Sequence, residues 1–223
     1  MEKVKEKDFV KVDYTGKLPD GGVFDTTLEK VAKEHNIFSE KANYSPVTVC
    51  VGEKQIIPGL DEELEGKEIG KEYTITLPPE KAFGKRDIKK MRIVPMSTFR
   101  EHKIDPHPGL QVDMDGEMGL VSRVSGGRII VNFNHPLAGK EITYTFKINE
   151  KITDTKEKLT AFLHSTLRIP EDKIEAVVKD DKAEITLPME FPLQITTMLA
   201  QKLVELTNLK DVLFQKKGAE KKE

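Results

Sequence analysis

Four segments far apart in the chain alternate apolar and polar residues, and this pattern constrains the fold more than any other feature. They span residues 8–18, 47–51, 72–77 and 142–152. Successive side chains of a strand point to opposite faces of a sheet, so a period of two predicts strands with one buried face. Val23–Thr26 follows the turn residues Pro19-Asp20-Gly21-Gly22, which predicts a hairpin with the first strand.

Helical spacing in this part of the chain is limited to two short stretches. Residues 27–38 carry apolar side chains at helical intervals. A second helix is expected to hold Leu60 and Leu64 one turn apart and to end at Gly66, since glycine is a common residue after a helix.

Residues 153–223 predict a further α+β unit. The expected elements are a helix after Asp154 and Glu157, strands at 174–179 and 183–187 around Asp180-Asp181, a helix opened by Pro192, and a strand at Asp211–Phe214. One face of the second helix carries Ile195, Met198, Leu199, Leu203 and Leu206. The charged tail from Lys216 is expected to be disordered.

The composition excludes several classes of protein. Of the 223 residues, 37% are hydrophobic, and no apolar run reaches the roughly 18 residues of a membrane helix. The formal net charge of −2 gives no reason to expect nucleic-acid binding. The single cysteine, Cys50, excludes a disulfide framework and is expected to be an inert packing residue. Because the N-terminus has no apolar run typical of a signal peptide, we expect a cytoplasmic protein.

The motifs of several enzyme classes are missing from the sequence. Gly139-Lys140 is followed by Glu141, so it is not a phosphate loop, and neither His-Glu-x-x-His nor Gly-x-Ser-x-Gly occurs. The five histidines are scattered, whereas a metal site needs several ligands that converge. We therefore expect no metal and no cofactor.

Residues 85–131 differ from their surroundings. Short alternating runs flank Ser125-Gly126-Gly127, and four of the seven methionines lie in this segment, which predicts a small β-rich module. Its apolar residues suit either the core of the module or a flexible surface for apolar ligands, and the sequence leaves both open. The residues in question are Met91, Ile93, Val94, Met96 and Phe99.

Four blocks of sequence occur in a specific order along the chain. They are Val12–Thr27, Gln55–Leu60, Gly70–Glu72 and Leu77–Gly84. In this order they resemble the FKBP-type peptidyl-prolyl isomerases. Asn134–Gly139 resembles the return motif of the SlyD-type branch, in which a small chaperone domain is inserted after the Ala-aromatic-Gly block. The resemblance covers residues 4–152, and the metal-binding tail of that branch is missing.

The resemblance implies an α+β fold in which an antiparallel half-barrel β-sheet wraps on a short helix. We expect residues 1–86 and 132–152 to form this isomerase domain, residues 87–131 an inserted chaperone-type domain, and residues 153–223 a C-terminal α+β domain. The segment from Glu29 to Tyr44 is longer than in minimal members and is expected over or beside the pocket.

The resemblance also implies the residues of a catalytic pocket. They are Tyr14, Phe24, Asp25, Ile56, Ile57, Leu60, Phe83 and Tyr144. Asp25 matches a carboxylate near the substrate carbonyl, the backbone N–H of Ile57 matches a donor to a substrate carbonyl, and Leu60 replaces a frequent Trp floor. Phe83 replaces a frequent Tyr, so we expect weaker binding of macrolide-type inhibitors with isomerisation retained.

The implied reaction is rotation about an Xaa-Pro amide, which makes and breaks no covalent bond. The expected partners are unfolded or proline-containing polypeptides, held by Met91, Ile93, Val94, Met96 and Phe99 if these line a surface. A non-catalytic holdase is the main alternative, and a nucleic-acid adaptor has less support. Because three short strands leave an open sheet edge, we expect residues 153–223 to mediate homodimerisation or docking to a partner.

Overall fold

The computed structural model describes residues 2–216, which divide into two compact units. One unit combines the chain up to Leu77 with the chain from Ile142 onward, and the other comprises Pro78–Glu141. No helix within residues 2–216 is long and apolar enough to cross a membrane.

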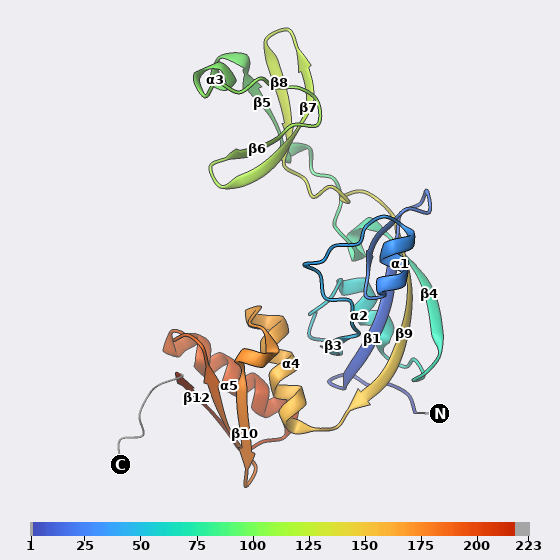
Figure 1. The fold of residues 1–223 in the computed structure, drawn as a ribbon, viewed down its shortest axis with the longest axis vertical. Helices are drawn as coiled ribbons and strands as arrows, with labels where there is room; N and C mark the ends of the chain where they lie inside the picture. Colours follow the sequence, from blue (N-terminus) through green and yellow to red (C-terminus); the bar gives the residue numbers. More distant parts are fainter. Residues whose placement is uncertain (1, 217–223) are drawn as a thin grey trace. The chain divides into compact units, whose positions relative to one another are not determined.

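The first unit contains a five-stranded antiparallel sheet (Figure 1). Its strands are β1 (Phe9–Lys17), β2 (Val23–Thr26), β3 (Val47–Cys50), β4 (Glu72–Leu77) and β9 (Ile142–Ile152). The order is β2-β1-β9-β4, and β3 also pairs with β1, alongside Phe9–Val12. Figure 1 shows the sheet curling around α2 (Pro58–Leu64), so the predicted half-barrel wrapped on a short helix is confirmed.

The predicted helix over residues 27–38 is shorter in the structure. Helix α1 spans Glu29–Glu34, and only Ala32 within it is buried. Asn36 has a left-handed backbone with φ of 57°, which ends the helix before Ile37. The predicted extent of the helix is therefore wrong at both ends, and Leu28, just before it, is exposed.

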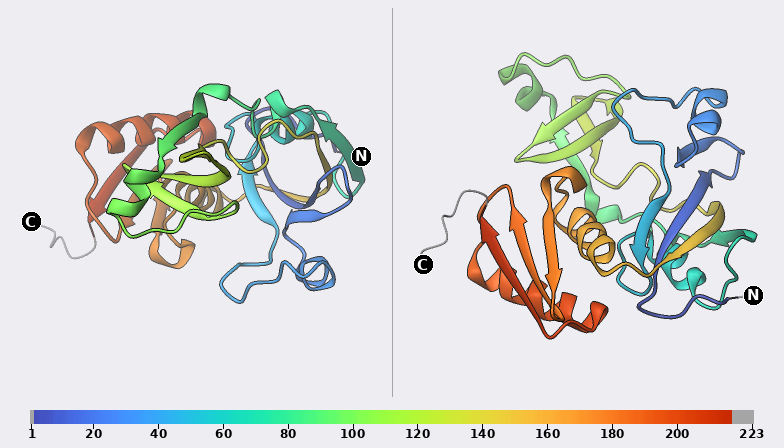
Figure 2. Two further views of the ribbon diagram at one scale, coloured as in Figure 1. Left: turned by 90° about the horizontal axis from the view of Figure 1, so that it is seen from above. Right: turned by 60° about the horizontal axis from the view of Figure 1, so that its bottom comes forward.

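The C-terminal part of this unit is a three-stranded sheet with two helices on one face (Figure 2). The elements are α4 (Thr155–Leu167), the 3₁₀ turn η3 (Glu171–Lys173), β10 (Glu175–Lys179), β11 (Lys182–Leu187), α5 (Leu193–Thr207) and β12 (Asp211–Lys216). As predicted, the Asp154 side chain caps α4 by accepting a hydrogen bond from the Glu157 N–H at 2.8 Å. Lys216 belongs to β12, and the rest of the predicted disordered tail lies outside the described residues.

The predicted face of α5 is only partly buried. Leu199, Leu203 and Leu206 pack in the core, whereas Ile195 and Met198 are exposed. The spacing correctly shows which side chains share a helix face, but burial depends on whether another element covers that face. At the start of the helix this face is therefore left open.

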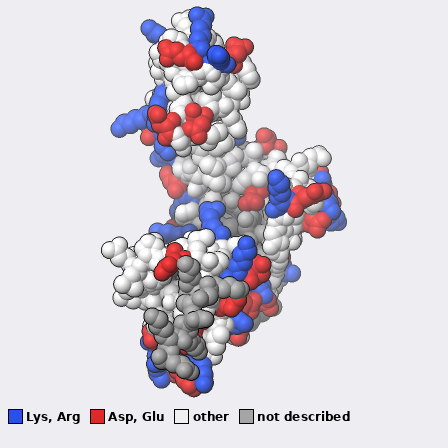
Figure 3. Space-filling model, turned by 60° about the vertical axis from the view of Figure 1, so that its left-hand side comes forward, with Lys and Arg blue, Asp and Glu red and all other residues white. Residues whose placement is uncertain are grey.

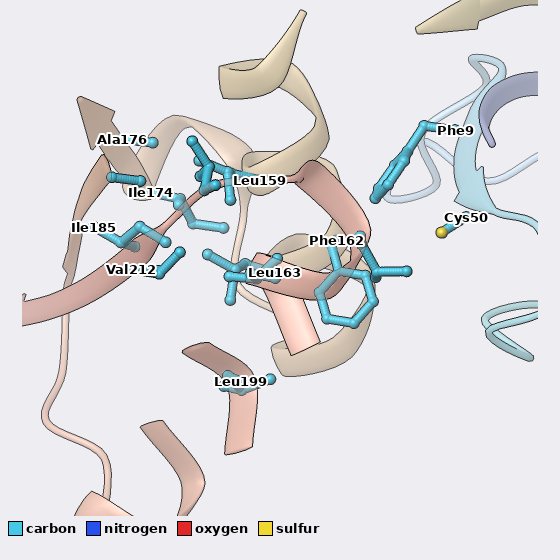
Figure 4. Packing of buried hydrophobic residues seen from close by; sticks show 14 of the residues in the cluster. Phe9, Cys50, Leu159, Phe162, Leu163, Ile174, Ala176, Ile185, Leu199 and Val212 are labelled. Atoms are coloured by element: carbon cyan, nitrogen blue, oxygen red, sulfur yellow. The ribbon is translucent and has the colours of Figure 1, made fainter. Parts of the chain in front are cut away.

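The two parts of the first unit share one buried cluster. Figure 4 shows Phe9 and Cys50 from the half-barrel beside Phe162 and Leu163 of α4. Burial raises the pKa of the Cys50 thiol to about 12, so Cys50 stays protonated at neutral pH. Its predicted role as an inert packing residue is confirmed.

The second unit is built on a four-stranded antiparallel sheet in the order β5-β8-β7-β6. Its elements are the 3₁₀ turns η1 (Pro79–Lys81) and η2 (Ile88–Lys90), β5 (Met91–Pro95), α3 (Met96–Glu101), β6 (Gln111–Met114), β7 (Glu117–Ser125) and β8 (Arg128–Asn132). The predicted hairpin around Gly126-Gly127 is confirmed. A separate core includes Val94, Phe99, Val121, Ile129 and Val131.

The return motif Asn134–Gly139 is hydrogen-bonded to the segment through which the chain enters this unit. The Gly139 N–H donates to the Gly84 carbonyl at 2.8 Å, and Asn134 exchanges two hydrogen bonds with the Asp87 backbone at 2.8 and 2.9 Å. The entering and leaving segments are thereby held together. The compact unit is consequently wider than the predicted insert of residues 87–131.

Charged side chains of both signs are interspersed on the surface (Figure 3). Lys11, for example, lies 2.8 Å from both Glu150 and Glu157, and Lys202 lies 2.7 Å from Glu53. The last pair joins α5 to the loop after β3, in addition to the shared core.

Candidate active site

Three aromatic rings meet on one side of the half-barrel, and we call Tyr14, Phe24 and Tyr144 the ring cluster. The Tyr144 ring makes edge-to-face contacts with Tyr14 at 5.7 Å and with Phe24 at 5.9 Å between centroids. The rings come from β1, β2 and β9, which are neighbours in the sheet. The pairing of strands far apart in sequence therefore assembles the cluster.

Gly16 makes room for these rings. It lies opposite Asp25 on β2 and Tyr144 on β9 in the strand register. A methyl group added at Gly16 would lie 2.6 Å from the tip of the Phe24 ring and 2.9 Å from Tyr144. A lone glycine inside an alternating strand can indicate a close approach, so this residue could have been found from the sequence.

Asp25 lies at the rim of the ring cluster. The Tyr14 hydroxyl donates a hydrogen bond to Asp25 Oδ2 at 3.1 Å. Burial, followed by the nearby Asp25 charge, raises the pKa of Tyr14 and of Tyr144 well above the ordinary tyrosine value. Both phenols therefore keep their protons at neutral pH, and Tyr14 serves as a donor.

Two buried threonines hold Tyr14 in place against β2. The Tyr14 N–H donates to Thr27 Oγ1 at 3.0 Å, and Thr26 Oγ1 donates to the Tyr14 carbonyl at 3.1 Å. The sequence Phe24-Asp25-Thr26-Thr27 thus supplies a ring, a carboxylate and two anchoring hydroxyls in succession. Sequence reasoning identified the first two and missed the anchors.

A small hollow of about 240 Å³ adjoins the ring cluster. Tyr14, Phe24 and Asp25 line one side of it. Ile37, Tyr44 and Val47 line the other side, so the segment after α1 lies beside the pocket as expected. These three residues were missed because nothing in their spacing indicates which way the loop folds.

A large hollow of about 1060 Å³ lies beside the small one within the same unit, and the two share lining residues. Tyr14, Asn43 and Val47 line both hollows, and Ile56 lines the large one. The lining is polar as well as apolar, and its far side is formed by the C-terminal segment.

The remaining predicted pocket residues lie outside this lining. Leu60 is fully buried on α2, and Ile57 precedes α2 with its carbonyl accepting from the Leu60 and Asp61 N–H groups. Phe83 belongs to the Pro78–Glu141 unit, where its ring stacks on His135 at 4.5 Å. Among residues 2–216, no three His, Cys, Asp or Glu side chains form a group suited to a metal.

Comparison with known proteins identifies the family of this chain. The model of the family described as FKBP-type peptidyl-prolyl cis-trans isomerase matches residues 1–100. The short-type peptidyl-prolyl cis-trans isomerase of Methanocaldococcus jannaschii is 37% identical over 147 residues, which cover 66% of this chain and 93% of that protein. The chain belongs to the FKBP-type peptidyl-prolyl cis-trans isomerases.

Other FKBP-type isomerases are also similar. The 16 kDa enzyme of Escherichia coli (strain K12) is 31% identical over 154 residues, covering 67% of this chain and 94% of that protein. SlyD of Aeromonas hydrophila is 28% identical over 159 residues, covering 70% and 68%. A second family model, described as the FKBP26 IF domain, matches residues 92–137. The isomerase activity predicted from the sequence resemblance is therefore confirmed, and the enzyme rotates peptidyl-prolyl bonds.

Proposed function

We propose that this FKBP-type isomerase acts on Xaa-Pro bonds of unfolded or partly folded polypeptides, which its second unit holds. The observation that carries the proposal is the ring cluster with Asp25 at its rim. The barrier to amide rotation is roughly 18–20 kcal/mol because conjugation must be lost. A thousandfold acceleration requires only about 4 kcal/mol of selective stabilisation.

The ring cluster suits this chemistry because it offers apolar walls and few charges. A planar amide is strongly dipolar, whereas a twisted amide is less so, and a site that excludes water favours the twisted state in relative terms. Tyr14 and Asp25 orient one another and the substrate carbonyl. Within residues 2–216 the Ile57 N–H has no acceptor, so it is available to a second substrate carbonyl.

Ile56 and Leu60 complete the proposed pocket within the first unit. Ile56 faces the large hollow, and Leu60 supports the site from its buried position on α2. Phe83 offers a ring without a hydroxyl, for which we expect isomerisation with weaker binding of macrolide-type inhibitors. An inhibitor titration of wild type against Phe83→Tyr tests this expectation.

The site assignment is tested by Asp25→Ala in an isomerase assay on a proline tetrapeptide. We expect kcat/KM to fall by about tenfold to a hundredfold, because a charge-assisted contact contributes about 1.5–3 kcal/mol. Asp20→Ala is the matched control, since Asp20 is also exposed and, among residues 2–216, bonds only the Gly22 N–H in the adjoining turn. Equal activity of wild type and Asp25→Ala would remove Asp25 from the site.

The second unit offers an open apolar sheet face for clients. Ile93 on β5 pairs with Ile130 on β8, and Met91, Met118 and Leu120 lie on the same face. Ile93 is 64% exposed and Met118 is 59% exposed. Unbranched, polarizable methionine suits binding of varied apolar segments.

The residues expected from the sequence to hold clients differ in burial. Val94 and Phe99 are buried in the unit's own core, and Met96 packs against that core. Ile93 and Met91 lie on the open face, so the proposed client surface consists of Met91, Ile93, Met118, Leu120 and Ile130.

The double variant Ile93→Ser with Met118→Ser tests the client surface. We expect catalysis of a proline-limited refolding reaction to fall on the order of tenfold, since each side chain buries more than a methylene on binding. Activity on a tetrapeptide should stay at the wild-type level, because linkage only raises the effective concentration of a held client. Val177→Ser, at an equally exposed position on β10, is the control. Equal losses on both substrates would contradict this division of labour.

Family membership argues against the alternative of a holdase without catalytic activity. Proline-exchange NMR on a short peptide distinguishes the two, because only an isomerase raises the rate of cis-trans exchange. A cytoplasmic location is part of the proposal, and cell fractionation tests it.

We also propose self-association as a homodimer through the C-terminal segment. Leu193 and Met198 on α5 are 81% and 70% exposed, and β10 and β12 form the edges of their sheet. Removing the whole segment would expose Phe9 and Cys50, so the sharper test is Leu193→Ser with Met198→Ser. Unchanged sedimentation relative to wild type would exclude this contact.

A further inference from the structure

The large hollow reaches from the isomerase site to the C-terminal segment. Tyr14, Val47 and Ile56 line it on the half-barrel side. Pro170 and Asp172 line it on the other side. Its volume of about 1060 Å³ is slightly above the roughly 300–1,000 Å³ typical of ligand sites, which leaves room for an extended peptide.

The two sides of the hollow are fixed to each other. Gln55 bridges them, because its Oε1 accepts from the Cys50 N–H at 2.8 Å while its Nε2 donates to Ser165 Oγ on α4. Lys11 on β1 forms ion pairs with Glu150 and, across the hollow, with Glu157. The two sides also share the buried cluster that includes Phe9, Cys50 and Phe162.

One side of the hollow is suited to an extended polypeptide. Val47, Thr48 and Val49 of β3 line it, and in the described sheet β3 pairs with β1 alone. On its other edge the Cys50 N–H and carbonyl are already bonded to Gln55 and Glu53. The Thr48 backbone groups remain there to bond an added strand, which is a recurrent mode of peptide binding. The substrate of this enzyme is itself a polypeptide that must continue beyond the proline.

The lining of the hollow carries surplus negative charge. Four carboxylates and one ammonium group face it, and Lys11 is already shared by Glu150 and Glu157. Glu171 and Asp172 on η3 are exposed, and neither forms an ion pair with another residue among 2–216. These two carboxylates are therefore free to meet a cationic side chain.

We propose that the large hollow binds the chain flanking the substrate proline and that Glu171 and Asp172 select flanks containing Lys or Arg. The inference rests on the isomerase site proposed above and gives residues 153–216 a role in substrate choice. The free edge of β3 binds the backbone of the flank, and the carboxylates on η3 set its sequence preference.

The test compares proline tetrapeptides with the same peptides extended by two Lys or two Glu residues on either side. For the wild-type chain at low ionic strength, we expect kcat/KM for a Lys-extended peptide to exceed that for its Glu-extended partner by about threefold to tenfold. Raising the salt concentration should shrink this ratio, because the Debye length falls below about 10 Å.

Variants test whether Glu171 and Asp172 cause the preference for Lys-extended peptides. Glu171→Gln with Asp172→Asn should bring the ratio close to one, whereas Asp180→Asn with Glu184→Gln should keep it. The control pair removes the same charge at exposed sites outside the hollow. No preference in the wild type, or equal ratios in both double variants, would overturn the inference. Failure to turn over the unextended tetrapeptide would instead contradict the isomerase site.

Discussion

Gly16→Ala is the perturbation that most directly probes the ring cluster. Gly16 is buried on β1 and has no positive φ, so alanine brings no backbone strain there. Its new methyl group would lie 2.6 Å from Phe24 Cζ and 2.9 Å from Tyr144 Cε1. Reaching 3.4 Å, the start of ordinary contact, requires the Phe24 ring to move by about 0.8 Å.

This displacement should affect catalysis more than folding. Overpacking of this kind costs about 1–3 kcal/mol of stability, which a folded chain of this size tolerates. A misplacement near 1 Å in a catalytic site can cost on the order of a hundredfold in rate. We therefore expect kcat/KM on a proline tetrapeptide to fall between about tenfold and a hundredfold.

The assay combines tetrapeptide isomerisation with thermal unfolding of the same samples. Gly119→Ala is the matched control, because its methyl group would lie 2.5 Å from Val131 and 2.7 Å from Phe133 in the other unit. It should lower stability by a similar amount while tetrapeptide activity is retained. Wild-type kcat/KM in Gly16→Ala would refute the claim that the placement of these rings drives the rotation.

Three further predictions concern single groups. Tyr14→Phe removes the hydrogen bond to Asp25 and should lower kcat/KM by about fivefold in the same assay, whereas an unchanged value would show that the bond has no catalytic role. Asp154→Ala removes the cap of α4 and should lower the free energy of unfolding in urea by about 0.5–2 kcal/mol; no change would mean that the cap is replaced by water. Burial raises the pKa of Cys50 from 9.0 to about 12, so its stabilising effect is complete below pH 9 and is lost as pH rises towards 12. Urea unfolding of Cys50→Ala across this range should show a shallower alkaline decline than the wild type, and parallel curves would contradict the argument.

Much of the secondary structure follows from local patterns. The strands β4 and β9, the cap at Asp154 and the turn at Asp180-Asp181 lie where the sequence places them. Each depends on residues within a few positions of one another, where side-chain alternation or hydrogen-bonding capacity is decisive. Helix α1 is less well predicted, because a short amphipathic segment has no strong preference without the surface that it packs on.

Part of the candidate site could likewise be predicted from local motifs, and part could not. Tyr14, Phe24, Asp25 and Tyr144 were predicted from motifs, and the structure brings them together. The far side of the large hollow was not predicted, since the bridge from Gln55 to Ser165 spans more than a hundred positions in the chain.

The sequence by itself determined the strands, the helix starts, the family and the residue types of the pocket, because these depend on local periodicity and on motifs in a specific order along one chain. Only the tertiary structure decided that residues 153–216 share a core with Phe9 and Cys50 and form a side of the hollow that opens from Tyr14. The physical reason is that burial and the lining of a cavity are properties of two surfaces in contact, and no local pattern specifies which surface will meet another.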